Sequence, residues 1–316
     1  MGSRHHASHM KQFTLTAGIA ALCLPGVSLL ASAHATGAGT CPGRNGKIAV
    51  VSRPGEQNAI GVFKPNRRLR ILYRGVRENS ISNLSFSCDG KKIVFTEAGG
   101  TPSRALRVLN LSTGEAPFVP TQRLTGGAPA FLPSGRILFS GGRVDPNRVG
   151  GTFTVRPDGT GLHRLFGREQ IAASPDGRWF VATDRQGHLR VLYLLNAKGK
   201  RVDTLTPPAS PETEYLNPSF SPNGKLIAYE ERHFGLPSHD ILYVVRRDGS
   251  HRRRLTFGPE SASEPAFSPD GRWLAFTRTK SEGPAGNVFA MLLRNPSEVH
   301  KFGLSYGYQY PAWEPR

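Results

Sequence analysis

The sequence predicts an all-β protein, a six-bladed β-propeller of four-stranded blades. Three observations predict it: a hairpin-like motif recurs along the chain, its copies lie 42 to 47 residues apart, and the two chain ends carry complementary halves of one further copy. A repeat of this length is the size of one four-stranded propeller blade.

The motif is clearest in the stretch EPAFSPDGRWLAFTR, residues 264–278. Pro269 presets φ, Asp270 can bond the backbone ahead, and Gly271 can take the left-handed conformation, so the three residues predict a tight turn. The alternating residues on each side predict the two strands of a hairpin. Further copies are NLSFSCDGKKIVFTE (83–97), APAFLPSGRILFSG (128–141), IAASPDGRWFVATD (171–184) and NPSFSPNGKLIAYEE (217–231). Two more strand-like runs follow each copy, which gives four strands per unit.

The two chain ends predict how the ring closes. YPAWEPR, residues 310–316, begins the motif and stops before its glycine, whereas RNGKIAVVSR, residues 44–53, begins at the turn. We therefore expect the N-terminal strands to pair with the C-terminal inner strand, which leaves no open sheet edge at the join. An open solenoid would instead need capped ends.

Residues 1–35 predict export. The opening MGSRHHASHM resembles an expression tag or an upstream extension, and the apolar run that follows ends in an A-x-A site at residues 33–35, as in a secretory signal cleaved after Ala35. A membrane anchor is the alternative, but Pro25 and Gly26 interrupt a run that is short for a span. We expect residues 36–316 to form a single monomeric propeller, periplasmic or secreted, with no membrane span after cleavage.

Charge and cysteine content fit an exported protein. The formal charge is +18, and removal of the first 35 residues leaves 39 basic and 23 acidic side chains, a charge of +16. Cys41 and Cys88 remain as an even pair, which predicts one disulfide in an oxidising compartment. Two unpaired buried thiols are the alternative. A zinc site is not indicated, because two cysteines without a nearby histidine do not make a ligand set.

The repeat also resembles a known family. The pattern P-x-[FW]-S-P-[DN]-G-x-x-[IL]-A-[FY]-x-[ST], followed by D-G-[ST]-x-x-x-R-L-T at residues 248–256, is similar to the WD-like repeat of TolB-type propellers, found also in prolyl oligopeptidase-like enzymes. In the TolB family an additional N-terminal α/β domain docks an inner-membrane partner, and the propeller binds a peptidoglycan-associated lipoprotein. Only about ten residues separate the predicted cleavage site from the first strand, so we expect a propeller without that domain.

The candidate binding residues lie where the repeats differ. The aspartates of the turns recur because the turns need them, which indicates a structural role. Seven residues before each turn glycine, at the start of the inner strand, the copies differ, and inner strands line the central channel. We expect these side chains to surround the channel mouth and bind a partner, with Glu169 as an additional carboxylate; the alternative is that they only solvate the channel and cap strand ends. The positions are Asn83, Ala128, Gln170, Asn217, Glu264 and Tyr310.

No cofactor or catalytic set is predicted. Calcium could bind amide and carboxylate oxygens of this ring, but with one acid among the six positions we expect weak affinity. The histidines are scattered, and there is neither a G-x-S-x-G elbow nor room for a hydrolase domain. The leading hypothesis is a non-enzymatic module that binds an envelope protein or an anionic envelope polymer. The rival is a small propeller hydrolase or lyase that acts on a lactone or sugar with a divalent cation.

Basic runs flank the outer strands. Arg246-Arg247 and residues 251–254 surround an Asp-Gly turn, and several arginines between residues 67 and 74 form a similar hairpin. A solvated edge that resists sheet pairing is one interpretation, and attraction to anionic envelope polymers or lipid headgroups is the other. Export and the lack of interleaved exposed aromatic residues argue against nucleic acid.

Overall fold

The computed structural model describes residues 41–316 except 53–56, 64–67, 100–103, 123, 144–149, 168–170, 187–188, 209, 236–238, 281–285 and 304–306. In this part of the chain the regular elements are all β-strands. The same residues contain no helix with the length and apolar character needed to cross a membrane. The predicted signal segment, residues 1–35, lies outside the described residues.

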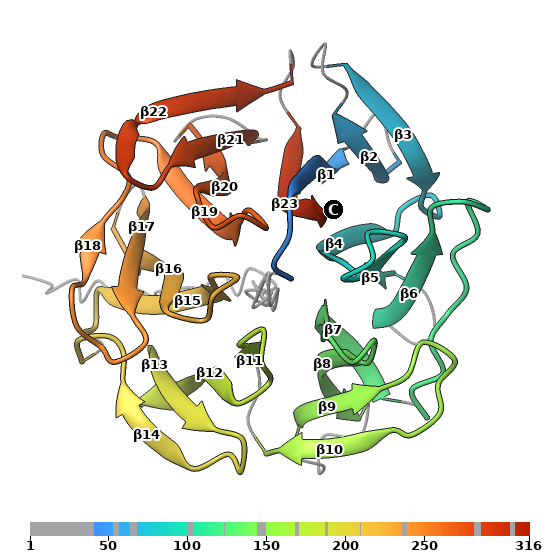
Figure 1. The fold of residues 1–316 in the computed structure, drawn as a ribbon, viewed down its shortest axis with the longest axis horizontal. Coiled ribbons are helices and arrows are strands. Elements are labelled where there is room, and N and C mark those ends of the chain that lie inside the picture. The colour runs from blue at the N-terminus through green and yellow to red at the C-terminus, as the bar shows by residue number, and fades with distance from the viewer. Residues whose placement is uncertain are drawn as a thin grey trace, which may run out of the picture. The chain divides into compact units, whose positions relative to one another are not determined.

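Six sheets surround a common centre, so the predicted six-bladed β-propeller is confirmed (Figure 1). The closing blade has the order β23 (Tyr308–Pro315), β1 (Asn45–Ser52), β2 (Ala59–Phe63), β3 (Leu69–Arg74). The second blade has β4 (Ser80–Phe86), β5 (Lys92–Ala98) and β6 (Arg104–Asn110). The third has β7 (Leu124–Phe131), β8 (Ile137–Arg143), β9 (Gly151–Val155) and β10 (His163–Phe166).

The remaining three blades repeat the same order from the centre outward. The fourth has β11 (Ile171–Ala173), β12 (Trp179–Gln186), β13 (Leu189–Asn196) and β14 (Arg201–Thr204). The fifth has β15 (Thr213–Phe220), β16 (Leu226–His233), β17 (His239–Arg246) and β18 (Arg253–Arg254). The sixth has β19 (Ser261–Phe267), β20 (Trp273–Thr279), β21 (Asn287–Leu292) and β22 (Asn295–Phe302).

The second blade differs from the others at its outer edge. Its sheet has three regular strands, and the segment from Glu115 to Val119 takes the fourth place through backbone hydrogen bonds to β6. The amide of Val108 donates to Pro117 O at 3.2 Å and that of Asn110 to Glu115 O at 2.8 Å. Pro117 has no N–H to donate, which explains why this segment does not continue as a regular strand.

The two chain ends pair as the sequence predicts. Strands β1 and β23 are antiparallel, with Ala49 opposite Ala312 and Ile48 opposite Trp313. The amide of Arg316 also donates to Arg44 O at 2.9 Å. The closing blade therefore takes its inner strand from the C-terminus and its other three strands from the N-terminal part of the described chain.

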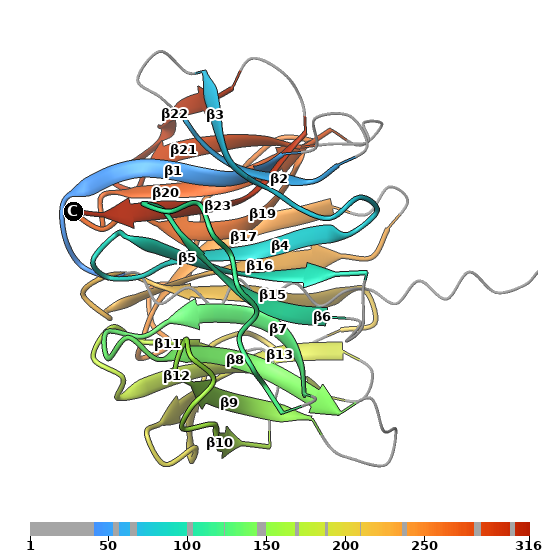
Figure 2. The same cartoon turned by 90° about the vertical axis from the view of Figure 1, so that its right-hand side faces the viewer.

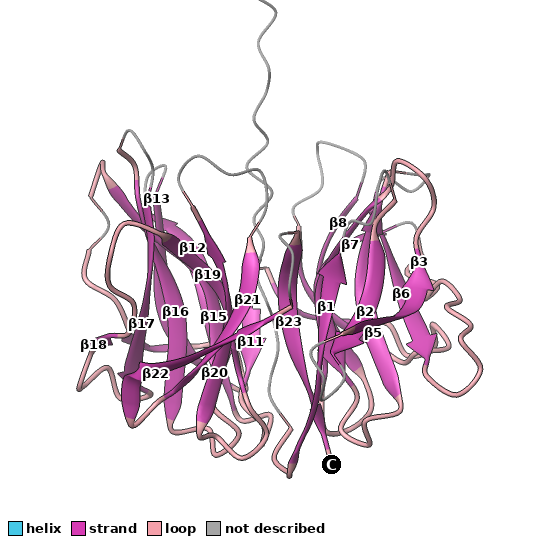
Figure 3. Cartoon of the chain, turned by 90° about the horizontal axis from the view of Figure 1, so that it is seen from above, coloured by secondary structure: helices cyan, strands magenta, loops and turns pink. Residues whose placement is uncertain are grey.

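The strands run roughly along the propeller axis, so the propeller has two distinct faces (Figures 2 and 3). We call the face at which the inner strands begin the channel face. The opposite face carries the tight turns and the C-terminus, and we call it the turn face. Between the faces, the core consists of apolar side chains packed between neighbouring blades, such as Leu194 of β13 with Phe220 of β15 and Tyr229 of β16.

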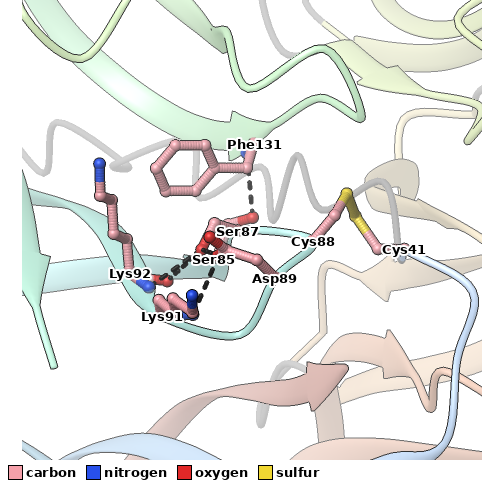
Figure 4. Close-up of a disulfide and its surroundings, with 8 residues drawn as sticks. All are labelled: Cys41, Ser85, Ser87, Cys88, Asp89, Lys91, Lys92 and Phe131. Atoms are coloured by element: carbon pink, nitrogen blue, oxygen red, sulfur yellow. Dashed lines mark hydrogen bonds between the residues drawn. A yellow bond between two sulfur atoms is a disulfide. The ribbon is translucent and has the colours of Figure 1, made fainter. Parts of the chain in front are cut away.

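The repeated turn is held by its own side chains, which confirms a structural role for the aspartates. In the turn of the second blade, Ser87 Oγ donates to Asp89 Oδ1 at 2.6 Å, and the amide of Lys91 donates to the same oxygen at 3.0 Å (Figure 4). These bonds, the Ser87 hydroxyl first, lower the pKa of Asp89. Gly90 takes φ +67°, which side chains with a Cβ rarely adopt.

The predicted disulfide joins Cys41 to Cys88, with 5.3 Å between the Cα atoms (Figure 4). Cys41 precedes β1, and Cys88 lies in the turn between β4 and β5. The bond therefore ties the start of the closing blade to the second blade.

Loss of this disulfide should destabilise the propeller. The sequence separation is 47, and closure of a loop of that length lowers the entropy of the unfolded chain by an amount worth about 4 kcal/mol. We expect a Cys41→Ser/Cys88→Ser variant, measured by thermal denaturation, to melt below the oxidised protein and to be insensitive to reductant. Identical melting temperatures for the oxidised protein and the variant would contradict this role.

Candidate functional site

The predicted channel-mouth positions share an unusual backbone conformation. Five of the six are described, and all five have positive φ, between 47° and 58°; they are Asn83, Ala128, Asn217, Glu264 and Tyr310. Gln170 and its neighbour Glu169 lie outside the described residues. Non-glycine residues rarely adopt positive φ, so its recurrence at one register position indicates a feature common to the five inner strands in which that position is described.

This feature is a β-bulge. The pairing of the first and second strands shifts at these positions, for example between Leu216 and Ser219 of β15 and between Ser263 and Ala266 of β19. Proline follows the bulge residue in four of the five copies. Proline is tolerated there because an extra residue in a bulge needs no partner in the hydrogen-bond ladder.

The bulges leave the predicted side chains enclosed. Asn83, Asn217, Glu264 and Tyr310 are between 3% and 7% exposed. We expected open hydrogen-bonding groups at the rim, and in this respect the expectation was wrong, because the bulge residues are buried among their neighbours. Partner binding by these residues stays a prediction. Of the residues one position earlier, Ser82, Ser263 and Gln309 are half-buried and therefore more accessible, whereas Leu216 is buried.

Glu264 joins the sixth blade to the closing blade. Its Oε2 accepts a hydrogen bond from Thr277 Oγ1 at 2.6 Å and another from the backbone amide of Tyr310 at 2.8 Å. Burial raises the pKa of Glu264 to about 7, although both hydrogen bonds act in the opposite direction. The carboxyl therefore exchanges its proton near neutral pH.

A second buried carboxyl lies in the fifth blade. Glu230 of β16 is fully buried, accepts a hydrogen bond from Asn217 Nδ2 at 2.7 Å, and pairs with Arg232 at 2.8 Å. Arg232 also pairs with Asp240 at 3.0 Å and with Glu214 at 3.5 Å. Arg190, from the fourth blade, adds a contact to Glu214 at 3.4 Å.

The charge balance of this network favours a protonated acid. Three carboxyl groups share Arg232, and the guanidinium group of Arg190 contacts one of them, Glu214. Burial and the nearby charge of Asp240 raise the pKa of Glu230 to about 8, and Glu264 adds a smaller effect in the same direction. Two neighbouring blades therefore hold two acids that can be neutral at physiological pH, both on strands that meet the channel face.

Sequence reasoning did not single out Glu214, Glu230, Arg232 and Asp240. A signal was present, because Glu230-Glu231-Arg232 directly continues the apolar run LIAY of β16. Charged residues at strand positions that should be buried require partners, which is itself an indication of an internal ionic network.

In the second blade, the equivalent site has buried polar atoms without hydrogen-bond partners among the described residues. Asn83 Oδ1 and Thr96 Oγ1, on adjacent strands, are buried and have no hydrogen-bond partner in the described structure. Thr96 lies opposite Ser82, as Thr277 lies opposite Ser263 in the sixth blade. The same scaffold thus carries a carboxyl in one blade and an amide in another.

Within the described ranges, no group of three or more His, Cys, Asp and Glu side chains is arranged to hold a metal ion. The channel-face residues described above can form hydrogen bonds, and Glu230 and Glu264 can exchange protons.

The basic run of the fifth blade fastens neighbouring elements. Arg252 stacks on Tyr243 at 3.8 Å from the ring centre, donates to Tyr229 Oη at 2.7 Å, and pairs with Glu231. Arg247 lies over the ring of Trp179 in the fourth blade at 4.9 Å. Arg253 donates to Leu293 O beyond β21 at 2.9 Å. These guanidinium groups are engaged within the propeller, so this run is not simply a solvated edge.

The fold and the repeated turn define the class of this protein as a six-bladed β-propeller. No family model matches the chain. The chain is 35% identical to the Tol-Pal system protein TolB of Gluconobacter oxydans over 108 residues. This matched stretch covers 33% of the chain and 23% of that protein. The chain is also 26% identical to an uncharacterised protein of Agrobacterium fabrum over 194 residues, and this second match covers 59% of the chain and 62% of that protein.

The solved structures agree with the sequence matches. The crystal structure of TolB from Acinetobacter baumannii superposes with a TM-score of 0.70 at 23% identity, over 86% of this chain and 67% of that one. The chain spans less than two thirds of the length of both curated relatives. The chain thus resembles TolB in part of its sequence and in its propeller fold, and the resemblance expected from the repeat is confirmed.

Replacement of Glu264 should change the pH dependence of stability. An acid whose pKa is raised in the folded state stabilises the fold below its unfolded pKa, and this contribution is lost as pH rises through the folded value. With a folded pKa of about 7, deprotonation of Glu264 should lower the free energy of unfolding of the native protein by up to about 3 kcal/mol between pH 4.5 and 8. Glu264→Gln keeps an oxygen that can accept both hydrogen bonds, so its denaturation midpoint should fall less over this range.

The control is Glu264→Ala, which removes both hydrogen bonds and should be less stable than the native protein throughout the same range. Parallel pH profiles for the native protein and Glu264→Gln, measured by denaturant unfolding, would contradict a proton held by Glu264.

Proposed function

We propose that this chain is an exported binding propeller whose channel face recognises an envelope protein. Two facts support the proposal. The sequence resembles TolB, a protein of the Tol-Pal system, over part of its length. The channel face also carries half-buried, partly accessible polar residues, Ser82, Ser263 and Gln309, each directly before a bulge residue of an inner strand.

The observation that carries the proposal is a difference in burial between two successive residues of the inner strands. The described bulge residues are buried, whereas the residue before the bulge is half-buried and so partly exposed in three blades, at Ser82, Ser263 and Gln309. A rigid rim with differing side chains suits recognition of a peptide or loop, because little conformational entropy is lost when the partner binds. Export places such a rim among envelope proteins and anionic envelope polymers.

Arginine at the accessible rim should abolish capture of the partner. We would compare the native chain with Ser82→Arg/Ser263→Arg by affinity capture from an envelope extract of the source organism, with mass spectrometry of the retained proteins. Rim positions replace Asn217 and Glu264 as targets, because arginine at either buried site would break internal hydrogen bonds. We expect a protein that the native chain retains and the variant does not.

The matched control is Thr113→Arg/Ser297→Arg, which adds the same charge at exposed positions away from the channel face. It should retain the partner as the native chain does. Equal retention by the rim variant, with all proteins folded, or the absence of any retained protein would contradict recognition by this face.

A small propeller hydrolase or lyase assisted by a divalent cation is the second candidate. One observation favours it: the pKa values of Glu230 and Glu264 are raised to about 8 and about 7, as in carboxyls that exchange protons during catalysis. Under the binding proposal, calcium should leave the melting temperature unchanged. A calcium-dependent rise that Glu264→Gln abolishes would instead support the enzyme.

A further inference from the structure

A groove on the turn face separates the closing blade from the second blade. Its volume is about 410 Å³, within the range of pockets that hold small ligands or single side chains. Strands β2 and β3 form one wall, and the turn of the second blade with the end of β6 forms the other. The groove lies far along the strands from the channel-face residues described above, so it is a separate site.

Four cationic side chains line this groove: Lys47, Arg70, Lys91 and Lys92. Lys47, Arg70 and Lys91 are exposed, and Lys92 is half-buried. None of the four side chains forms an ion pair with a carboxylate of the described residues. They are therefore available to an anionic ligand.

The two acids of the groove are already engaged. Asp89 Oδ1 accepts hydrogen bonds from Ser87 Oγ and from the backbone amide of Lys91. Glu314 Oε2 accepts a hydrogen bond from the backbone amide of Lys47 at 2.9 Å and pairs with Arg316 at 3.3 Å. Both carboxylates keep their negative charge, and the charges of Lys91 and Lys92 help to lower the pKa of Asp89. The groove therefore has four cations against two anions, an excess of two positive charges.

Apolar side chains form the remaining surface of the groove. Val62 and Phe86 are buried at its base, and Leu72 and Leu111 are half-buried beside them. A purely anionic polymer would leave this surface unused. An apolar side chain placed there would cover the exposed parts of Leu72 and Leu111 as well as its own surface, which stabilises the complex by about 25 cal/mol per Å² of apolar area removed from water.

The wider turn face is basic as well, which provides internal controls. In every blade the residue after the turn glycine is a lysine or an arginine: Lys47, Lys91, Arg136, Arg178, Lys225 and Arg272. Arg178 and Arg272 occupy the same motif position as Lys91 and are exposed, but they do not line this groove. A general attraction of polyanions to the face can thus be separated from binding in the groove.

We propose that this groove binds an acidic peptide segment of another protein, with an apolar side chain on the floor formed by Val62 and Phe86. The carboxylates of the peptide lie against Arg70 and Lys91 on either side. This site is independent of the channel face and goes beyond the proposed function, because a partner on one face leaves the other accessible.

Fluorescence anisotropy with short labelled peptides tests the proposal. The probes carry aspartate and glutamate around a central leucine, phenylalanine or valine, and a matched set carries serine at the centre. We expect the Arg70→Gln/Lys91→Gln variant to bind the apolar-centred peptides about tenfold more weakly than the native chain. We expect the serine-centred peptides to bind the native chain several-fold more weakly than the apolar-centred peptides do, which is the loss of affinity expected when one small apolar contact is removed.

The control variant is Arg178→Gln/Arg272→Gln, which removes the same charge from the same face. It should bind as the native chain does. Equal weakening by both variants, or equal affinity for serine-centred peptides, would overturn the proposal in favour of non-specific polyanion attraction. So would the absence of binding by every peptide up to about 1 mM. None of these results depends on the channel-face capture experiment, so the two proposals fail separately.

Discussion

The antiparallel pairing of β1 with β23 is the contact on which the rest of the propeller depends. Each blade packs against its two neighbours, so a gap at one join would expose the apolar faces of two blades and leave unpaired sheet edges. Pairs such as Ala49 with Ala312 close that gap within a single sheet. The Cys41–Cys88 bond reinforces the same join covalently, because it ties the segment before β1 to the second blade.

The closing strand also depends on a side chain from outside its own blade. The backbone amide of Tyr310, at the bulge of β23, donates to Glu264 of β19. An acceptor is needed because a bulge residue leaves its N–H out of the regular ladder. Placing a carboxyl there buries an ionisable group, which is why its pKa is raised. The closure of the ring and the raised pKa of Glu264 therefore have one structural origin.

Much of the fold could be predicted from the sequence, because the determinants of a propeller blade are local. Residue types such as Asp89 and Gly90 predict the turns, and the spacing of these turns indicates the length of one blade. The half motifs at residues 44–53 and 310–316 predicted the closure. The missing regular strand of the second blade follows from Pro117, which sequence reasoning did not weigh.

The candidate site was predicted less well, for a physical reason. The register correctly brought Asn83, Asn217, Glu264 and Tyr310 to equivalent places, but a bulge adds a residue and changes which side chain meets solvent. Alternation alone cannot reveal a bulge. The network around Arg232 also joins residues from three strands of one blade and from β13, and such long-range pairing leaves only a weak trace in sequence.

The repeat itself explains why the two faces differ in chemistry. On the turn face every blade needs the same tight turn, and the repeat also places a cation after each turn glycine. Specificity there must come from residues outside the motif, and Arg70 of β3 with Leu111 beyond β6 are such residues. On the channel face the bulge fixes only the backbone, and the side chain changes from blade to blade. A fold that repeats its backbone can thus hold two unlike surfaces, one distinguished by what lies beside the repeat and the other by variation within it.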